Sequence, residues 1–268
     1  MPRSHPAMPK DDSGLGTNGL KRKFSMHGTP RSALRYTPLE YVNVRRPVDR
    51  IAYICAACNN KKVLDLGALD ETAFAQKTSH GTWLHEEITK FADTVIGLDS
   101  SVLIPDDGLV TARNGKIIRG DVLKVENFLH ENDFNPEVVL AGELIEHLAN
   151  PLDFLESLRN IARLKGSTLL LSTPNATAIH NCLIALANRE STHADHLCIL
   201  SFKTLNTLLS RAGYESWEII PYHAEFAEMQ QRNDGIRKRF VMTGEIAINL
   251  LETVFPLVSF GFLVNAII

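Results

Sequence analysis

The sequence predicts an α/β domain built on a doubly wound parallel sheet of seven strands. Short apolar runs alternate with helical patterns from residue 50 onward, which is the order of elements in such a sheet. The chain has 268 residues, 44% of them hydrophobic, so a large core is available without disulfide bonds. The expected strands are Lys62–Leu66, Thr94–Leu98, Lys116–Arg119, Glu137–Ala141, Ser167–Ser172, Glu215–Pro221 and Phe260–Ile267.

Helix signals between these runs fit the same fold. Pro151 begins a helix as a first-turn proline, and apolar residues recur at helical spacing until Gly166 ends it. Ser201 opens a similar helix, and Gly213 follows its end. The apolar stretch 51–58 predicts a buried helix before the first strand, so its C-x-x-C pair is expected to pack in the core rather than to bind zinc.

The N-terminal part of the chain differs in charge from the rest. Residues 1–48 hold nine basic and three acidic residues, a net charge of +6, which leaves −9 for residues 49–268. Such a basic extension suggests an anionic partner. The alternative is a largely disordered, solvated leader over residues 1–30, which we favour because Pro, Gly, Ser and Lys dominate there. Residues 34–48 are more apolar and are expected to pack on the domain as a strap or lid.

The last part of the chain holds an insertion and an uncharged end. Residues 222–255 read as an insertion that covers the acceptor, with an apolar helix at 240–254. Its basic residues, Arg232, Arg237, Lys238 and Arg239, are either a grip for phosphate or carboxylate or a solvated face, and the second is more common. Residues 253–268 carry no charge, but a membrane span needs about 20 apolar residues, so we expect a buried strand pair and no transmembrane segment.

The cellular setting follows from the cysteines and the N-terminus. The four cysteines form no paired framework, and the first residues are polar and proline-rich rather than apolar as in a signal peptide. We therefore expect a cytoplasmic protein.

Acidic residues follow four successive strands of the predicted sheet. The carboxyl ends of parallel strands meet at one edge, where such folds bind ligands. The first strand ends in Asp65 and Gly67, and a glycine there lets the backbone turn close to a ligand. The second strand delivers Asp99 and Ser100, and an acid at this place can accept both hydroxyls of a ribose. Together these residues predict a nucleoside cofactor.

The third and fourth strands complete this site. Asp121 and Val122 are expected to receive an adenine amino group and to pack against its ring, and Glu143 lies opposite the remaining part of the ligand. Because acidic residues dominate and no G-x-x-x-x-G-K occurs, a polyphosphate would be repelled. The cationic sulfonium of S-adenosylmethionine (SAM) would be attracted instead.

Two stretches carry a family resemblance. Residues 138–151, VVLAGELIEHLANP, and residues 166–175, GSTLLLSTPN, resemble the class I SAM-dependent methyltransferases of the ubiquinone-biosynthesis O-methyltransferase type. The similarity covers residues 50–220. It implies a Rossmann-like fold with strand order 3-2-1-4-5-7-6, the last strand antiparallel, and SAM as cofactor. The residues that would hold SAM are Asp65, Gly67, Asp99, Asp121 and Glu143.

The glycine-rich turn departs from that family. It reads G-A-L-D from Gly67 without the later glycines, and Asp99 follows Gly67 by 32 residues where about 20 is usual. We expect an enlarged first loop over residues 68–81, followed by a helix that brings Trp83 and His85 near the cofactor. The departure also leaves open a catalytically silent SAM-binding protein.

The residues expected to act on the acceptor follow the fourth strand. Glu143, Glu146 and His147 form E-x-x-E-H, which places all three on one helical face. They could take a divalent metal, with His193 or His196 completing the shell. Alternatively, Glu143 contacts the cofactor, Glu146 is solvated and His147 packs near the substrate. His196 is the first choice for a catalytic base and His147 the second catalytic candidate.

The acceptor is the least determined part. E-x-x-E-H with downstream histidines resembles the metal-using small-RNA 3′-end 2′-O-methyltransferases and some ubiquinone-pathway O-methyltransferases, in which a metal would lower the pKa of the acceptor hydroxyl. The first hypothesis is O-methylation of a small-molecule, glycan or lipid-linked acceptor. Metal-assisted 2′-O-methylation of RNA is ranked lower, because aromatic residues make up only 7% of the chain.

Overall fold

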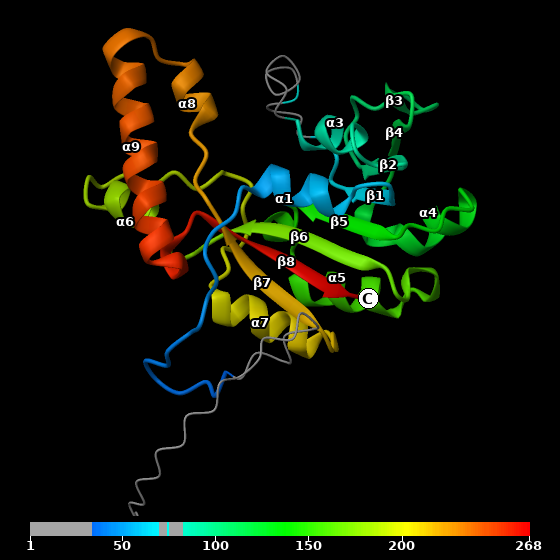
Figure 1. Cartoon of the computed structure of the whole chain (residues 1–268). Helices are drawn as coiled ribbons and strands as arrows, with labels where there is room; N and C mark the ends of the chain where they lie inside the picture. The colour runs from blue at the N-terminus through cyan, green and yellow to red at the C-terminus, as the bar shows by residue number, and fades with distance from the viewer. Residues whose placement is uncertain (1–33, 70–73, 75–82) are drawn as a thin grey trace, which may run out of the picture.

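A computed structural model describes residues 34–69, 74 and 83–268. Within these residues one sheet carries helices on both faces (Figure 1). Its eight strands lie in the order β3-β4-β2-β1-β5-β6-β8-β7. They are β1 Lys62–Leu66, β2 Thr94–Asp99, β3 Leu109–Ala112, β4 Gly115–Arg119, β5 Val138–Gly142, β6 Thr168–Pro174, β7 Trp217–Tyr222 and β8 Gly261–Ile267.

The central strands end at a common edge. β4, β2, β1, β5 and β6 are parallel, and in register Leu66 of β1 lies beside Leu98 and Ala141. Asp99 at the end of β2 lies beside Arg119 at the end of β4. The loops that follow β1, β2, β4 and β5 therefore leave from the same side of the sheet, as the sequence predicts.

The prediction of seven strands is wrong, because the sheet has an eighth strand, β3, which lies outside β4 at one edge. β3 pairs antiparallel with β4 across a turn at Arg113 and Asn114. Three of its four residues are half-buried and one is exposed, so it has no buried apolar run that would predict a strand. The remaining seven strands keep the expected relative order, and β8, the last in the chain, is antiparallel to β6 and β7.

The helices begin and end at residues with clear capping chemistry. The Asn150 side chain accepts a hydrogen bond from the Asp153 amide at the start of α5, and Ser201 forms a reciprocal capping box with Thr204 at the start of α7. Gly213, with φ +84°, follows α7. The helices are α1 Arg50–Ala57, α3 Leu84–Thr89, α4 Val125–Glu131, α5 Pro151–Asn160, α6 Ile179–Ala185, α7 Phe202–Arg211, α8 Ala227–Gln231 and α9 Gly235–Val254.

The core has two main parts, one on each face of the sheet, and a smaller third cluster that includes Trp83 and Ile117. Leu64 of β1 belongs with Phe154 of α5 and Leu205 of α7 to the larger cluster, whereas its neighbour Val63 packs with Ile54 of α1 on the opposite face. Successive residues of a strand point to opposite faces, so β1 contributes to both clusters. Each such fully buried side chain contributes about 1.5 to 3 kcal/mol to folding. Because β1 is packed on both faces, the first residue of the turn that follows it is held in a fixed position.

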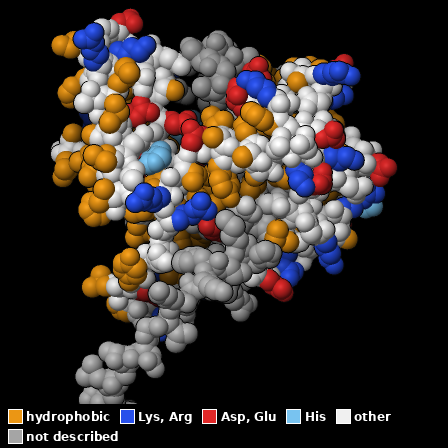
Figure 2. Space-filling model, viewed as in Figure 1, with side chains coloured by type: hydrophobic (Ala, Val, Ile, Leu, Met, Phe, Trp, Pro, Cys, Tyr) orange, Lys and Arg blue, Asp and Glu red, His pale blue; other side chains and the backbone are white. Residues whose placement is uncertain are grey.

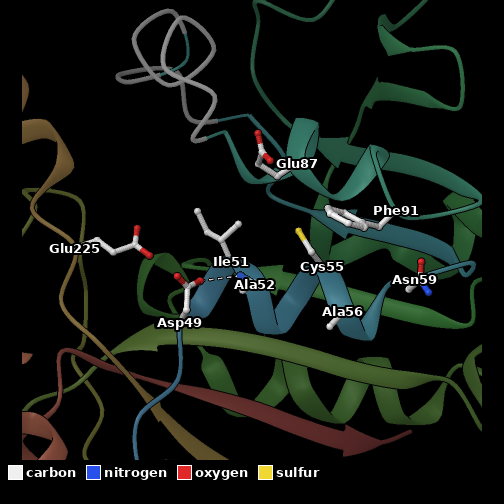
Figure 3. A pocket seen from close by; sticks show the side chains of 9 residues that line it. All are labelled: Asp49, Ile51, Ala52, Cys55, Ala56, Asn59, Glu87, Phe91 and Glu225. Atoms are coloured by element: carbon white, nitrogen blue, oxygen red, sulfur yellow. Dashed lines mark hydrogen bonds between the residues drawn. The ribbon is translucent and has the colours of Figure 1, made fainter.

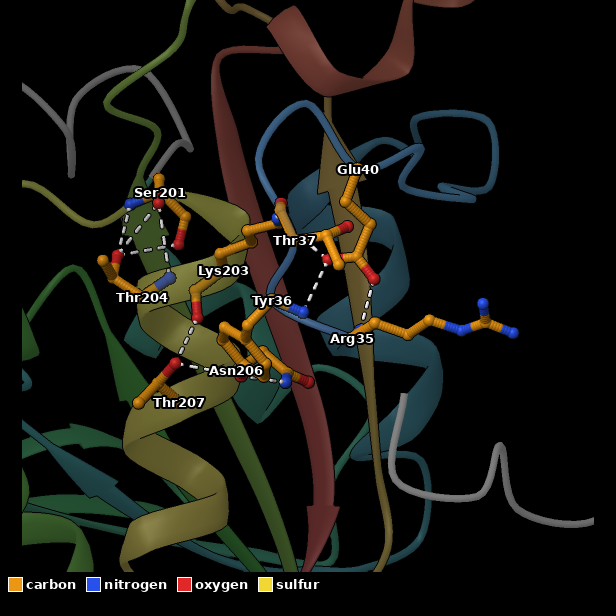
Figure 4. Close-up of polar contacts among 9 residues, drawn as sticks. All are labelled: Arg35, Tyr36, Thr37, Glu40, Ser201, Lys203, Thr204, Asn206 and Thr207. Carbon is orange, nitrogen blue, oxygen red and sulfur yellow. Dashed lines mark hydrogen bonds and ion pairs between the residues drawn. The ribbon is translucent and has the colours of Figure 1, made fainter. Parts of the chain in front are cut away.

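Residues 34–48 run along the outside of α7 and β7 as a strap (Figure 4). The Tyr36 hydroxyl accepts a 2.9 Å hydrogen bond from the Asn206 side chain, and Glu40 forms a 2.9 Å ion pair with Lys203. Val48 makes a parallel bridge with Tyr222. Apolar contacts hold the strap as well, because Leu34, Val42 and Val44 pack against the main core. Residues 1–30, for which the sequence predicts disorder, lie outside the described residues.

The insertion between β7 and β8 forms α8 and α9, and α9 begins five residues before the apolar helix expected at 240–254. After α9, the chain makes one short 3₁₀ turn, Pro256–Val258, and enters β8. The expected strand pair at 253–268 is therefore wrong, since β8 is a single strand that pairs with β6 and β7. No helix among the described residues combines the length and the apolar character that crossing a membrane would require.

Candidate active site

The turn after β1 is held by three elements. Gly67 has φ +72°, a left-handed conformation that favours glycine, and its amide donates to the Leu98 carbonyl at 2.9 Å. The Trp83 indole nitrogen donates to the Ala68 carbonyl at 2.9 Å. The Leu69 amide donates to Asp99 Oδ2, also at 2.9 Å. The turn is thus braced by the side chains of Trp83 and Asp99.

Asp99 links this turn to the end of β2. Its side chain is buried, and its second carboxylate oxygen accepts a 2.8 Å hydrogen bond from the Ser101 amide. Asp99 thus holds the backbone amides of Leu69 and Ser101 at the ends of β1 and β2. Ser100, beside it, is exposed.

Asp65 has a different environment from the one the sequence suggests. Its carboxylate is 3% exposed and lies 2.8 Å from Nδ1 of His85, whose Nε2 lies 3.0 Å from the Thr111 hydroxyl. Because Asp65 alternates with Leu64 and Leu66, it points to the α1 and α3 face of the sheet. The structure therefore ties Asp65 to His85 of α3, beneath the turn, rather than presenting it at the sheet edge.

Asp121 and Val122 follow β4 at the same sheet edge. The Asp121 side chain caps the short 3₁₀ turn Val122–Lys124 by accepting from the Leu123 amide at 2.9 Å, and it is about half exposed. Val122 is partly buried against the main core. An exposed carboxylate beside an apolar side chain is an arrangement that can receive a heteroaromatic ring.

Glu143 follows β5 and is fixed in an unusual backbone conformation. Its φ is +51°, and its amide donates to the carbonyl and the hydroxyl oxygens of Ser172. Its Oε1 accepts a 2.9 Å hydrogen bond from the Tyr222 hydroxyl and lies 3.9 Å from Arg50. Burial, together with the neighbouring Glu143, raises the pKa of Tyr222, so the phenol remains a donor.

Glu146 is fully buried, contrary to the solvated position considered from the sequence. Its Oε2 accepts a 3.0 Å hydrogen bond from the Thr173 hydroxyl, while Oε1 has no partner. Burial and the nearby Glu143 raise the pKa of Glu146 to about 8. Its backbone carbonyl accepts from the Leu197 amide at 2.8 Å, which ties the loop that contains His193 and His196 to E-x-x-E-H.

Three histidines meet beside Glu146. The ligand nitrogens of His147, His193 and His196 all lie within 4.8 Å of one another. The ring of His196 packs edge-on against His147, with centroids 4.6 Å apart. Nδ1 of His196 is buried without a partner, and burial and the other two histidines lower the pKa of His196. A neutral imidazole presents a lone pair, as metal binding and proton acceptance both require.

The methyltransferase domain family matches residues 40–219, which is more than half of the chain. The chain belongs to this family. It is a SAM-dependent methyltransferase of class I, with a Rossmann-like fold. The narrower resemblance to the ubiquinone-biosynthesis type stays a prediction, and no curated protein sequence matches the chain.

Solved structures share the fold at low sequence identity. A small RNA methyltransferase, HEN1, is 17% identical with a TM-score of 0.52, and the match covers 81% of this chain but 25% of that one. A SAM-dependent methyltransferase from Archaeoglobus fulgidus is 14% identical with a TM-score of 0.45, covering 81% and 90% of the two chains. A possible histamine N-methyltransferase from Thermotoga maritima is 11% identical with a TM-score of 0.49, covering 82% and 87%. At 17% identity the HEN1 match supports the fold alone.

The methyltransferase has a surface pocket that lies apart from these residues. Asp49, Cys55, Glu87, Phe91 and Glu225 are among the side chains that line it beside α1 (Figure 3), and its volume is about 670 Å³. None of the predicted site residues lines it. Because the predicted cofactor residues follow the ends of β1, β2, β4 and β5, we take this edge of the sheet, and not the pocket, as the candidate active site.

The structure brings together some of the predicted site residues and separates others. Among the described residues, one cluster of three or more potential metal ligands has its ligand atoms close enough to share an ion, and it consists of His147, His193 and His196. The carboxylates of Glu143 and Glu146 are not part of it. Their role as metal ligands stays a prediction. The enlarged loop expected at 68–81 lies mostly outside the described residues.

Sequence reasoning missed Arg50, Tyr222 and Thr173, which hold the two glutamates. Thr173 lies near the end of β6, the strand that pairs with β5, so the predicted pairing of these strands was a usable signal. Nothing in the local sequence around Arg50 or Tyr222 indicates a partner in E-x-x-E-H.

Proposed function

We propose that this methyltransferase transfers the methyl group of SAM to a hydroxyl oxygen of an acceptor bound beside His147, His193 and His196. The observation that carries the proposal is the position of these three histidines next to E-x-x-E-H, at the edge of the sheet where the expected cofactor residues end. A cluster of imidazoles suits an acceptor that must lose a proton, because a hydroxyl becomes a good nucleophile only as its proton leaves.

In this proposal SAM lies along the ends of β1, β2 and β4. Gly67 leaves room for the ligand next to the backbone, Asp99 holds the ribose, and Asp121 with Val122 holds the adenine. Ser100 lies beside Asp99, and Glu143 faces the methionine end. Asp65 supports this cradle indirectly through His85. When bound, SAM supplies an electrophilic methyl group on a cationic sulfonium, which the acidic side chains at this edge attract.

The histidines fit a divalent metal as well as a proton acceptor. The close nitrogens and the buried, unpartnered Nδ1 of His196 are what a metal site offers before the ion binds. A metal there would bind the acceptor hydroxyl and lower its pKa. Without a metal, His196 itself accepts the proton, and His147 packs against its ring and holds its orientation.

The acceptor is proposed to be a small molecule, a glycan or a lipid-linked molecule. The second candidate is the ribose 2′-hydroxyl of RNA, which the histidine cluster favours equally, since E-x-x-E-H with downstream histidines resembles that group of enzymes. The HEN1 structure is named as a small RNA methyltransferase, and its likeness to this chain in fold keeps RNA among the acceptors to be tested.

The proposal can be tested with S-adenosylhomocysteine and labelled SAM. Calorimetric titration of the purified chain with S-adenosylhomocysteine, in the presence and absence of EDTA, first establishes cofactor binding. Labelled SAM is then supplied with separate pools of lipids, glycans, small metabolites and RNA. Label in an alkali-stable ether of one pool supports O-methylation and identifies the acceptor class. Label only on nitrogen or carbon, or cofactor binding without transfer to any pool, contradicts it.

A matched pair of variants tests the role of the histidines. His147→Ala removes one ring of the cluster, whereas His130→Ala removes an exposed ring from α4. We expect His147→Ala alone to lower both turnover and the affinity for Mn²⁺ or Co²⁺ at least about tenfold, in line with the loss of one ligand. If the unmodified chain binds neither Mn²⁺ nor Co²⁺ and its turnover is insensitive to EDTA, the proposal loses its metal. His196 then remains as the base.

A further inference from the structure

Helix α9 keeps its polar side inside and its apolar side outside. Glu252 is fully buried, lies 3.1 Å from His223 Nδ1 and accepts a 3.1 Å hydrogen bond from the Ala224 amide. Two turns earlier in the helix, the half-buried Glu245 accepts a 3.4 Å hydrogen bond from the Phe226 amide. Both carboxylates of α9 therefore point toward α8 and the loop before it. This is the reverse of an ordinary surface helix, which turns its apolar side to the core.

The outer face of α9 is a stripe of large apolar side chains. Ile236, Phe240, Leu250 and Val254 are 85%, 81%, 65% and 60% exposed. Counted from Ile236, the other three lie 4, 14 and 18 residues further on, close to whole turns of an α-helix, so all four share one face. Smaller side chains lie between Phe240 and Leu250 on this face. So much exposed apolar surface on one helix face is rare on a protein that has no partner there and marks an interaction surface.

A cluster of exposed basic residues adjoins the stripe. Arg237, Lys238 and Arg239 lie in the first turn of α9 and are exposed. In Figure 2 the blue side chains lie at the top of the projecting α8–α9 unit, and hydrophobic side chains continue below them along its outer edge. The two acidic residues of α9 face inward, so its outer surface combines positive charge at one end with apolar side chains along its length.

The basic residues favour an anionic lipid surface over a second copy of this chain as the partner. If a second copy packed on α9 in parallel, the two basic runs would face each other. If it packed antiparallel, each run would lie against the end near Val254, where the nearest acid of the helix, Glu252, is fully buried. Either arrangement leaves the basic residues without an exposed counter-charge on α9. Anionic lipid headgroups would pair with Arg237 and Arg239, which lie on the two sides of the stripe, while the interface below them receives the apolar side chains.

We propose that α9 is a membrane-surface helix that binds anionic lipid bilayers. The helix lies in the plane of the interface, with Phe240 and Leu250 inserted below the headgroups and with Arg237 and Arg239, on either side of the stripe, among them. It lies on the bilayer and does not cross it, in agreement with the absence of a spanning helix from the described residues. The inference does not rest on the proposed acceptor chemistry, because α9 contributes no residue to the histidine cluster.

The test is co-sedimentation of the full-length chain with vesicles. One set contains phosphatidylcholine alone, and the other contains phosphatidylcholine with 30 mole per cent phosphatidylserine. We expect binding to the anionic vesicles that weakens as salt is raised. Phe240→Ser and Leu250→Ser should each weaken partitioning about tenfold, from the apolar burial that is lost. Arg239→Gln should weaken binding to anionic vesicles about fivefold and leave any binding to neutral vesicles unchanged.

The matched control is Val110→Ser on β3, which removes an apolar side chain that is 73% exposed on the edge strand at the other end of the sheet. It should bind vesicles like the unmodified chain. Equal loss of binding in Val110→Ser and Phe240→Ser, or no binding to anionic vesicles, overturns the proposal. A dimer in light scattering that Phe240→Ser dissociates, without vesicle binding, assigns the stripe to a second copy and also overturns it. Because all replaced residues are exposed, circular dichroism should be unchanged in every variant.

Discussion

The Tyr222 hydroxyl donates a 2.9 Å hydrogen bond to Glu143, joining the end of β7 to the residue that follows β5. The two residues are 79 positions apart in the sequence. This bond fixes one oxygen of a glutamate whose backbone is already constrained by Ser172. The side chain that is expected to face the methionine part of SAM is therefore oriented before any ligand binds, which lowers the entropic cost of binding.

The first prediction removes this bond. Tyr222→Phe deletes a donor to a carboxylate and should lower the free energy of unfolding by about 1 to 2 kcal/mol. It should also weaken S-adenosylhomocysteine binding, because Glu143 is freed to turn away. Urea denaturation and calorimetric titration measure the two effects. Tyr53→Phe serves as control, since the Tyr53 hydroxyl accepts from Asn265 on β8 and has no contact with the site. Equal ligand affinities in the two variants would refute the orienting role.

Strand positions could be predicted from the sequence because each central strand is a buried apolar run bounded by polar residues. β6, for example, has five consecutive buried residues, which predicts a strand covered on both faces. β3 could not be predicted, because its residues are half-exposed and it is a strand only through its pairing with β4. The common edge of Gly67, Asp99 and Glu143 followed from parallel topology alone.

The orientation of individual carboxylates was harder to predict. Because successive side chains of β1 point to opposite faces of the sheet, the sequence predicts that Asp65 points to the α1 and α3 face. Its partner His85, however, lies 20 residues away on a different element. Likewise, the burial of Glu146 depends on Thr173 and on the loop at Leu197, which only the folded chain brings together. Spacing along the sequence predicts which edge a residue occupies, whereas its partners depend on tertiary packing.

The second prediction concerns the ribose ligand. Asp99→Ala removes the expected acceptor for the ribose hydroxyls and the brace that holds the Leu69 amide. The affinity for S-adenosylhomocysteine should fall at least about tenfold, as for the loss of two hydrogen bonds to a charged group. Asp107→Ala, in the exposed loop before β3, is the control and should bind normally. An unchanged affinity in Asp99→Ala, measured by calorimetry, would show that the cofactor binds elsewhere.

The third prediction uses two glycines with opposite surroundings. A Cβ at Gly97 of β2 would lie 2.8 Å from the Cβ of Ala68 and 2.9 Å from Cγ1 of Ile117. Gly97→Ala should therefore destabilise the fold by about 1 to 3 kcal/mol and disturb the turn after β1. Gly244 of α9 has no neighbour within 4 Å of such an atom. Gly244→Ala should stabilise by up to about 1 kcal/mol through helix propensity. Thermal denaturation of both variants should show melting temperatures shifted in opposite directions.

The fourth prediction concerns thiol reactivity. Burial, with the nearby Asp65, raises the pKa of Cys58 to about 12, so this thiol stays protonated near neutral pH. Cys182 on α6 is exposed. With a disulfide reagent at pH 8 the folded chain should show a fast reaction that Cys182→Ser abolishes, and Cys58 should react only on unfolding. Mass spectrometry of the labelled peptides identifies each site, and rapid labelling of Cys58 in the folded chain would contradict its packing against β1.

The last prediction follows from the buried carboxyl group of α9. Burial raises the pKa of Glu252 above its ordinary value, although hydrogen bonds from Ala224 and His223 oppose the shift. The folded state therefore favours the protonated acid. Its contribution to stability is complete below the unfolded pKa of about 4.3 and is lost as the pH rises through the higher pKa of the folded state. Glu252→Gln, which mimics the protonated acid, should gain stability relative to the unmodified chain over this window, by about 1.4 kcal/mol for each unit of pKa displacement.

Glu137 provides a control with the opposite sign. Hydrogen bonds from the Lys62 amide and the Lys61 side chain lower the pKa of this exposed carboxylate, so its contribution is present above the unfolded pKa and is lost on acidification. Urea denaturation between pH 4 and pH 8 should therefore show the stability of Glu252→Gln, relative to the unmodified chain, increasing with pH, while that of Glu137→Gln decreases. Parallel curves for the two variants would mean that Glu252 is hydrated in solution, and the inward polar face of α9 would then have to be abandoned.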